Sequence, residues 1–169
     1  MGRSRGTRAT SAAQAAGIEH EIHDVDAGEI ASSRHGGQGL ASAVAHLLGV
    51  DGTRVFKTLV VQVGDDLAVA IVPSDASLDL KAMAQALDQK HAMMAERAEA
   101  ERATGYVLGG ISPLGQRRAM PMVLDAGAMD HATIFVSAGR RGLELELSPD
   151  DLVVVTGARL APIARASTG

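Results

Sequence analysis

One lysine interrupts a run of residues that is otherwise typical of an apolar strand, Val55–Val63. Side chains alternate along a strand, so Lys57 falls on the face of the aliphatic residues at the other odd positions of this run. An ammonium group there is costly unless it meets a carboxylate, a ligand phosphate or water. Lys57 is therefore a candidate ligand contact, with snorkelling at a sheet edge as the alternative. The adjacent Thr58 adds a hydroxyl on the other face.

Two segments place glycines beside small hydroxyl residues, between aliphatic runs. The first contains Gly109, Gly110 and Ser112, and the second contains Ser137 and Gly139. Such sequences let the backbone bend sharply and present N–H groups to a ligand. Either segment alone could be an ordinary turn. Two of them and a strand lysine in one small domain indicate a shared pocket for an anionic or carbonyl-bearing ligand.

Two arginine pairs stand next to these segments, Arg117–Arg118 after the first and Arg140–Arg141 within the second. Paired arginines are commonly solvated, but at these positions they could contact phosphates beside the pocket. The chain has a formal net charge of −4, whereas a protein that relies on broad phosphate contacts is typically basic. We therefore expect nucleic-acid contacts to be local and modest, or helped by a partner protein.

Several common chemistries are excluded or disfavoured by the residues present. The chain has no cysteine, which excludes a disulfide framework, a thiolate nucleophile and a Cys-type zinc site. His20 and His23 lie three apart on an expected strand and face opposite sides, so we predict no metal site. Ser112 and Ser137 lack a nucleophile elbow. In the P-loop-like segment 105–112, Ile111 stands where the phosphate-binding lysine is required, and we expect no cofactor.

The length of 169 residues fits one domain with a substantial core. With only 2% aromatic residues, that core must be aliphatic, and a base-stacking platform is excluded. Leucine and glutamate alternate over 143–147, which predicts a strand with one wet face. Strands outnumber long helices in an irregular order, which predicts a single α+β domain. We expect helices at 9–17, 40–48, 80–87, 96–103 and from Ser148, and strands at 18–25, 55–63, 67–72, 93–94, 121–125, 133–137 and 143–147.

The N-terminal residues are rich in Arg, Ser, Thr and Ala, with no acid before Glu19. We interpret residues 1–17 as a flexible basic arm with a short helix, rather than a transit peptide, and residues 18–165 as the domain. The polar, glycine-rich stretch 26–39 is expected to be a mobile loop. No apolar run approaches the ~20 residues of a membrane span, so we expect a cytoplasmic protein without membrane contact.

Four motifs in this order resemble the YbaK family of aminoacyl-tRNA deacylases, which is related to the editing domain of bacterial prolyl-tRNA synthetases. The resemblance covers about residues 18–163 and rests on Phe56–Leu59, Leu78–Lys81, Thr104–Gln116 and Val136–Glu146. It implies a mixed, mostly antiparallel sheet, partly closed like a barrel, with surrounding helices. It also implies hydrolysis of the ester of mischarged tRNA, foremost Cys-tRNA(Pro), by attack of the substrate's own thiol.

The resemblance further assigns roles to the candidate residues. Lys57 matches the family's essential lysine and would contact the 3′-terminal nucleotide, with Thr58 beside it. Gly109, Gly110 and Ser112 match the loop around the aminoacyl group, and Ser137 and Gly139 match the loop that faces it. Glu144 falls where this subgroup has aspartate, and it would contact the substrate. Arg140 and Arg141 match a basic pair that would contact tRNA.

Three departures from the family pattern bear on the choice of amino acid: Ala138 replaces a glycine, Glu144 is one methylene longer than aspartate, and Val25 replaces a tyrosine. Two alternatives therefore remain, a deacylase of Ala- or another small aminoacyl-tRNA and a non-catalytic module that binds tRNA or a synthetase. The expected partners are mischarged tRNA and prolyl-tRNA synthetase, and the protein is expected to be a monomer or a weak dimer.

Overall fold

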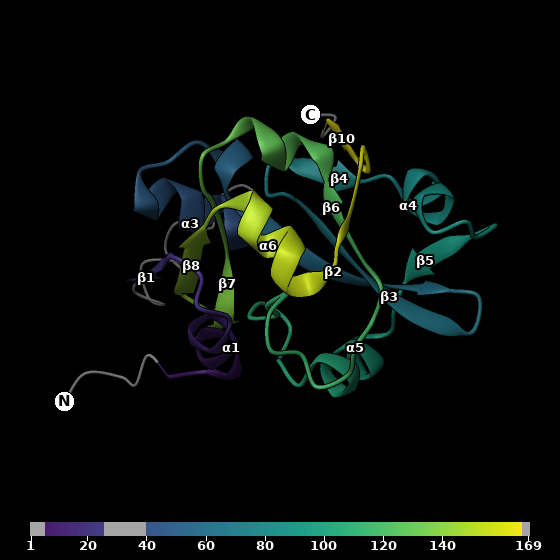
Figure 1. Ribbon diagram of the computed structural model, residues 1–169. Helices are drawn as coiled ribbons and strands as arrows, with labels where there is room; N and C mark the ends of the chain where they lie inside the picture. The colour runs from purple at the N-terminus through teal and green to yellow at the C-terminus, as the bar shows by residue number, and fades with distance from the viewer. Residues whose placement is uncertain (1–5, 26–39, 167–169) are drawn as a thin grey trace.

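The computed structural model describes residues 6–25 and 40–166, with the side chains of 40–42 omitted. The expected mobile loop at 26–39 and the first five residues of the basic arm lie outside the described residues. The secondary structure is an irregular mixture of strands and helices, which confirms the predicted α+β class (Figure 1). The elements are α1 (Arg8–Ala16), β1 (His20–Asp24), α3 (Leu40–Leu48), η1 (Gly52–Arg54), β2 (Phe56–Val63), β3 (Asp66–Pro73), β4 (Ala76–Leu78), α4 (Leu80–Ala86), β5 (Ala92–Met94), α5 (Arg97–Thr104), β6 (Met122–Asp125), η2 (Ala126–Asp130), β7 (Ile134–Arg140), β8 (Leu143–Leu147), α6 (Pro149–Thr156), β9 (Arg159–Ala161) and β10 (Ala164–Ala166).

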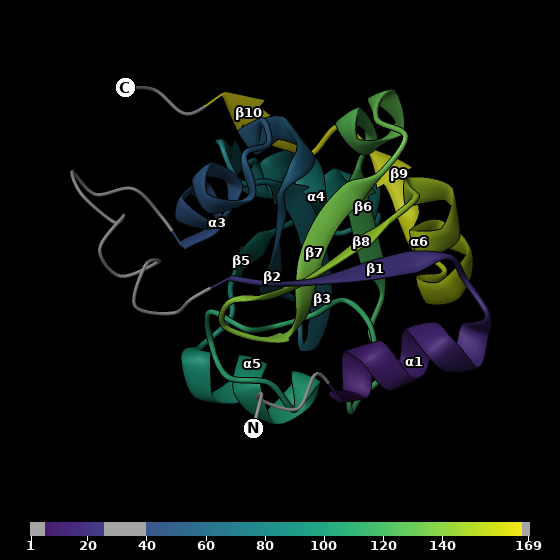
Figure 2. The ribbon, with the colours of Figure 1, turned by 90° about the vertical axis from the view of Figure 1, so that its left-hand side faces the viewer.

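The strands form two main sheets that meet near the start of β2. The larger sheet has the order β5-β2-β3-β6-β9, with antiparallel pairs around β2 and parallel pairs around β6. The smaller sheet, β1-β8-β7, is antiparallel and crosses in front of the larger one in Figure 2. A parallel bridge between Val55 and Phe135 connects the two. The predicted mixed, mostly antiparallel arrangement is therefore confirmed, whereas the described strands do not form a closed barrel.

Local sequence signals account for where these elements begin and turn. Asp79 Oδ1 accepts a hydrogen bond from the Ala82 N–H at 3.0 Å and caps α4. Ser148 Oγ does the same for the Asp151 N–H at 3.1 Å, with Pro149 as the first residue of α6. Gly64, with φ of 60°, makes the tight turn of the β2–β3 hairpin. These predicted caps and the predicted hairpin are confirmed.

The core is aliphatic, as the composition requires, and it includes α1. β3 is the central strand, and its residues 67–73 are all buried. Ala9 and Ala13 of α1 are fully buried in the largest apolar cluster, and the Thr7 hydroxyl donates to the Ala138 carbonyl at 2.5 Å. Helix α1 therefore shares the core of the domain. Within the described ranges, no helix combines the length and apolar character needed to cross a membrane.

The prediction that one face of β8 is exposed to water is wrong at Glu144, which is only 6% exposed. The β7–β8 register places Glu144 opposite Ser137 and Glu146 opposite Phe135. Phe135 packs with Val44 and Val55, so α3 and the segment leading into β2 cover this face of the small sheet. Leucine–glutamate alternation cannot reveal such a cover, because the covering residues lie about 100 positions earlier in the chain.

Candidate active site

A cavity of about 420 Å³ lies where the two sheets meet. Helix α3 and six further segments of the chain contribute to it, which is typical of a small-molecule site. Its mouth is apolar, since Leu108 and Met94 are 50% and 47% exposed. The lining residues are Val44, Phe56, Lys57, Thr58, Leu59, Ser74, Met94, Leu108, Gly109, Ile111, Ser137, Gly142 and Glu144.

The cavity brings together five of the residues that the sequence singles out: Lys57, Thr58, Gly109, Ser137 and Glu144. They come from β2, the glycine loop after α5, β7 and β8, and so from segments up to 87 positions apart (144 − 57). The shared pocket expected from two glycine segments and a strand lysine is therefore present in the structure. Among the remaining lining residues, Val44, Ser74 and Met94 belong to none of the four motifs, so no motif marked them.

Lys57 is half-buried in the cavity wall. Burial lowers the pKa of its ammonium group, and the negative charge of Asp75 offsets part of that effect. Among the residues that the structure describes, no carboxylate lies within ion-pair distance of Lys57. The ammonium group is thus held in a costly position without a direct protein counter-ion, as a ligand contact requires.

Glu144 is the second unusual group in the cavity. Burial raises its pKa from an ordinary value of 4.5 to about 8, so the carboxyl is mostly protonated at neutral pH. In the described part of the chain it forms no hydrogen bond or ion pair. A neutral carboxyl both donates and accepts hydrogen bonds, so it can contact a carbonyl oxygen, a hydroxyl or an amine. Thr58 adds a further free group, because its buried Oγ1 has no partner within residues 6–25 and 40–166.

Gly110 allows two backbone segments to approach each other closely, and its own N–H is not available to a ligand. Its N–H donates to the Val107 carbonyl at 2.9 Å within the loop. A Cβ placed on Gly110 would lie 2.7 Å from Arg140 Cα. Only glycine therefore lets the loop after α5 rest directly on the end of β7, which brings Gly109 and Ser137 to the same cavity.

The other predicted site residues lie outside the cavity wall. Ser112 is fully buried inside its loop, where its Oγ accepts from the Leu114 N–H at 3.2 Å. Gly139 donates its N–H to Ser137 Oγ at 3.1 Å and so positions that side chain. Arg140 forms an ion pair with Asp24 at 3.6 Å, whereas Arg141 is exposed at the β7–β8 turn. The two arginines stand beside Gly142, which does line the cavity.

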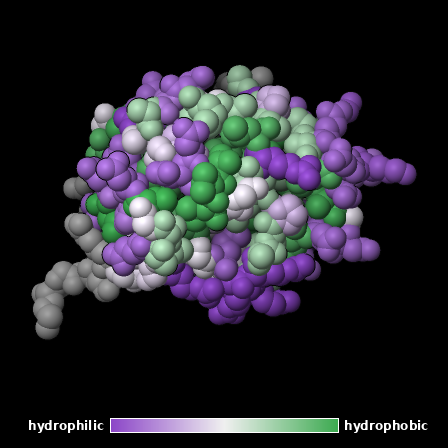
Figure 3. Space-filling view, viewed as in Figure 1, coloured by the Kyte–Doolittle hydropathy of each residue, from purple (hydrophilic) through white to green (hydrophobic). Residues whose placement is uncertain are grey.

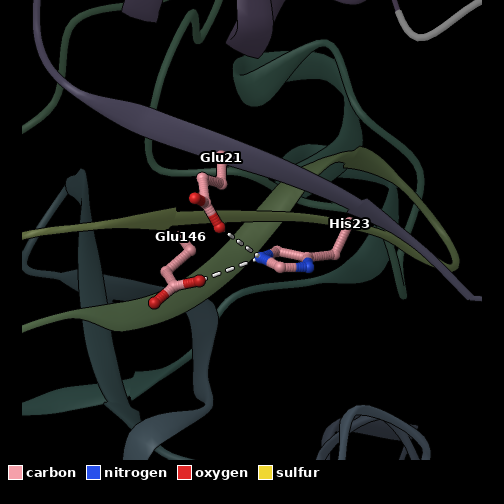
Figure 4. A group of neighbouring side chains, drawn as sticks. All are labelled: Glu21, His23 and Glu146. Carbon is pink, nitrogen blue, oxygen red and sulfur yellow. Dashed lines mark hydrogen bonds and ion pairs between the residues drawn. The ribbon is translucent and has the colours of Figure 1, made fainter.

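A network of charged side chains lies on the small sheet, outside the cavity lining (Figure 4). His23 Nε2 is 2.9 Å from Glu146 Oε1 and 3.7 Å from Glu21 Oε2. These three groups could each offer a metal ligand. However, Arg54 and Thr133 already engage Glu146 Oε2, at 3.3 Å and 2.5 Å, so the network is balanced by its own cation. Arg54 also lies over the Phe135 ring, and the network therefore ties η1 to the small sheet.

Comparisons with known proteins identify the family to which this chain is related. Residues 35–154 match the family described as the aminoacyl-tRNA editing domain. A protein of Enterococcus faecalis named "Putative Cys-tRNA(Pro)/Cys-tRNA(Cys) deacylase EbsC" is 39% identical over 125 residues, which cover 73% of this chain and 76% of that protein. The uncharacterized protein YwhH of Bacillus subtilis is 29% identical over 109 residues, covering 64% and 69%.

A solved structure supports the fold independently. A crystal structure described as "a putative trans-editing enzyme for prolyl tRNA synthetase" superposes with a TM-score of 0.83 at 20% identity, covering 98% of this chain and all of the other. At that identity the likeness concerns the fold alone, whereas the family match extends over most of the chain and includes all four of its motifs. The chain therefore belongs to the aminoacyl-tRNA editing domain family, as an aminoacyl-tRNA deacylase of the YbaK type.

Proposed function

We propose that the protein is a trans-editing enzyme that removes cysteine from Cys-tRNA(Pro). The observation that carries this proposal is the position of Lys57, half-buried at the cavity and without an ion-pair partner among the described residues. A cation there suits a terminal phosphate or ribose of tRNA, while the aminoacyl group enters between Gly109 and Ser137. The exposed apolar rim, Met94 and Leu108, suits the adenine base.

The chemistry follows from the groups that line the cavity. None of the lining residues in the described part of the chain is a histidine, and Ser137 Oγ already accepts from Gly139. A serine nucleophile therefore lacks a base. In the proposed reaction the cysteine thiol attacks its own ester: the sulfur–carbonyl carbon bond forms, the ester C–O bond breaks, and the thiol proton ends on the ribose oxygen. Water then opens the thiolactone to free cysteine.

The protein's contribution is orientation and electrostatics. Holding the thiol against the carbonyl carbon makes the attack intramolecular and geometrically fixed. Lys57 and the neutral Glu144 offer donors to the charge that develops on the carbonyl oxygen or on the leaving oxygen. We propose that the editing unit comprises residues 18–165 together with α1, which shares its core, and that it acts in the cytoplasm. We also propose that prolyl-tRNA synthetase presents the tRNA, since an acidic domain has few phosphate contacts of its own.

Deacylation assays on tRNA(Pro) charged with cysteine, alanine or proline test this proposal. We expect rapid loss of cysteine and slow loss of alanine and proline, because only cysteine carries the attacking thiol. Preferential release of alanine would contradict the thiol mechanism and favour a deacylase of small aminoacyl-tRNAs. Binding of tRNA without release of any amino acid would contradict catalysis and leave a non-catalytic module.

A further inference from the structure

Four exposed arginines from distant parts of the chain meet on one side of the molecule. We call the set Arg8, Arg102, Arg117 and Arg118 the arginine face. A Cβ built on Gly105 would lie 3.2 Å from Arg8 Nη1 and 3.4 Å from Arg117 Cβ, so these two side chains flank the same point. Arg102, Arg117 and Arg118 line one shallow depression. Arg117 therefore links the start of α1 to the end of α5.

A hydrogen-bonded loop connects the arginine face to the cavity. The N–H groups of Arg117 and Arg118 donate to the carbonyls of Thr104 and Ala103 at 2.9 and 3.0 Å, which closes the base of the loop after α5. Inside the loop the Tyr106 hydroxyl donates to the Leu114 carbonyl at 2.6 Å. The tip of the same loop, with Leu108 and Gly109, lines the cavity. One hydrogen-bonded loop thus connects the arginines to the cavity, where we propose that the 3′ end of the substrate binds.

Helix α1 is seated against this loop by direct backbone contact. A Cβ on Gly115 would lie 2.5 Å from the Arg8 carbonyl oxygen, so a side chain there would push α1 away. Arg8 itself is close enough to Tyr106 to act on its phenol electrostatically. The helix that the sequence places in a basic arm therefore supplies a fixed cation to the arginine face.

The charge of the arginine face is not neutralised by ion pairs. Within residues 6–25 and 40–166, none of its four arginines lies within ion-pair distance of a carboxylate, whereas four others, Arg54, Arg97, Arg140 and Arg159, are paired. Asp65 and Glu99 also line the depression and offset part of the charge. Figure 3 shows hydrophilic side chains gathered along the lower side of the molecule, where α5 lies in Figure 1. An acidic protein that keeps four free guanidinium groups together has a local site for phosphates.

We infer that the arginine face holds phosphates of the tRNA acceptor arm while the charged 3′ end occupies the cavity. The inference rests on the proposed function and identifies where the body of the substrate lies. It also assigns a larger share of the tRNA contact to this face than to Arg140, whose guanidinium is engaged by Asp24. Phosphate contacts of this kind position the nucleic acid without reading its sequence.

Two substrates separate this inference from the proposed function itself. One is full-length Cys-tRNA(Pro), and the other is a cysteinylated CCA trinucleotide, which fills the cavity but lacks the acceptor arm. For Arg117→Ala/Arg118→Ala we expect kcat/KM on the full tRNA to fall about tenfold, with no change on the trinucleotide. The dependence of log affinity for uncharged tRNA(Pro) on log salt should become shallower by about 1–2.

Arg8→Ala provides an independent variant, because Arg8 is distant from the loop in the sequence. This substitution should also lower the affinity for tRNA. Arg159→Ala is the control, because Arg159 is exposed and lies on β9, the edge strand of the larger sheet.

Two results would overturn the inference. Equal losses on both substrates would show that the arginines act through the loop rather than on the acceptor arm. Unchanged affinity for tRNA would point to an acidic protein partner instead. If the unmutated protein cleaves neither substrate, the proposed function fails, while tRNA binding still tests the arginine face.

Discussion

Replacing Lys57 by alanine should lower kcat/KM for Cys-tRNA(Pro) by on the order of 100-fold or more, comparable to the loss of one oxyanion donor. The ammonium group is half-buried at the cavity and has no ion pair among the described residues, so its removal costs little stability. Single-turnover deacylation measures the effect on the chemical step, and thermal unfolding checks that the fold is retained. Lys57→Arg should also lose most of the activity, because a guanidinium is wider and planar.

Lys90→Ala is the matched control for this experiment, since Lys90 is an exposed lysine outside the cavity lining. It should deacylate at the rate of the unmutated protein. Full activity of Lys57→Ala would remove the lysine from the site and contradict the proposed mechanism. A loss of activity accompanied by unfolding would instead assign Lys57 a structural role.

Replacing Glu144 by glutamine should stabilise the protein at alkaline pH. The folded protein keeps the carboxyl proton up to a pKa of about 8, whereas the unfolded chain loses it near the ordinary value of 4.5. Glu144 therefore contributes full stability below pH 4.5, and its contribution declines by up to about 1.4 kcal/mol per pH unit until the pH passes 8. Glutamine does not titrate, so the variant lacks this decline.

Urea unfolding at pH 5, 7 and 9 measures the difference. The free energy of unfolding of Glu144→Gln, relative to the unmutated protein, should rise by about 4 kcal/mol between pH 5 and pH 9. Glu99→Gln, at an exposed position of α5, should show no comparable change. A pH-independent difference for Glu144→Gln would mean that the carboxyl is already ionised in the folded protein.

Most helices and strands could be predicted from the sequence, because the residues that specify them lie within or next to each element. The hairpin of β2 and β3, the Asp79 cap and the Ser148–Pro149 start each depend on residues within a few positions. The strands β4, β9 and β10 were not predicted; each has three residues and is defined by pairing with a distant segment. Such short strands carry no period of their own.

The candidate site was predictable to the extent that unusual residues mark it. Lys57 stands out as a cation in an apolar strand, and the glycine segments stand out by composition. Glu144 was misjudged as part of a wet face because α3 covers it from about 100 positions away. Only part of the arginine face could be predicted from the sequence. Arg117 and Arg118 are adjacent in the chain, but Arg8 comes close to them only because α1 packs against the loop.

Comparing cysteinyl-tRNA(Pro) with the same tRNA carrying S-methylcysteine tests the thiol-assisted mechanism most directly. The methyl group removes the nucleophile while leaving the ester, the tRNA and the contacts of Lys57 and the arginine face in place. We expect rapid deacylation of the first substrate and no deacylation above the spontaneous rate for the second. Enzymatic release of S-methylcysteine at a rate close to that of cysteine would require an attacking water or protein group and would contradict the mechanism.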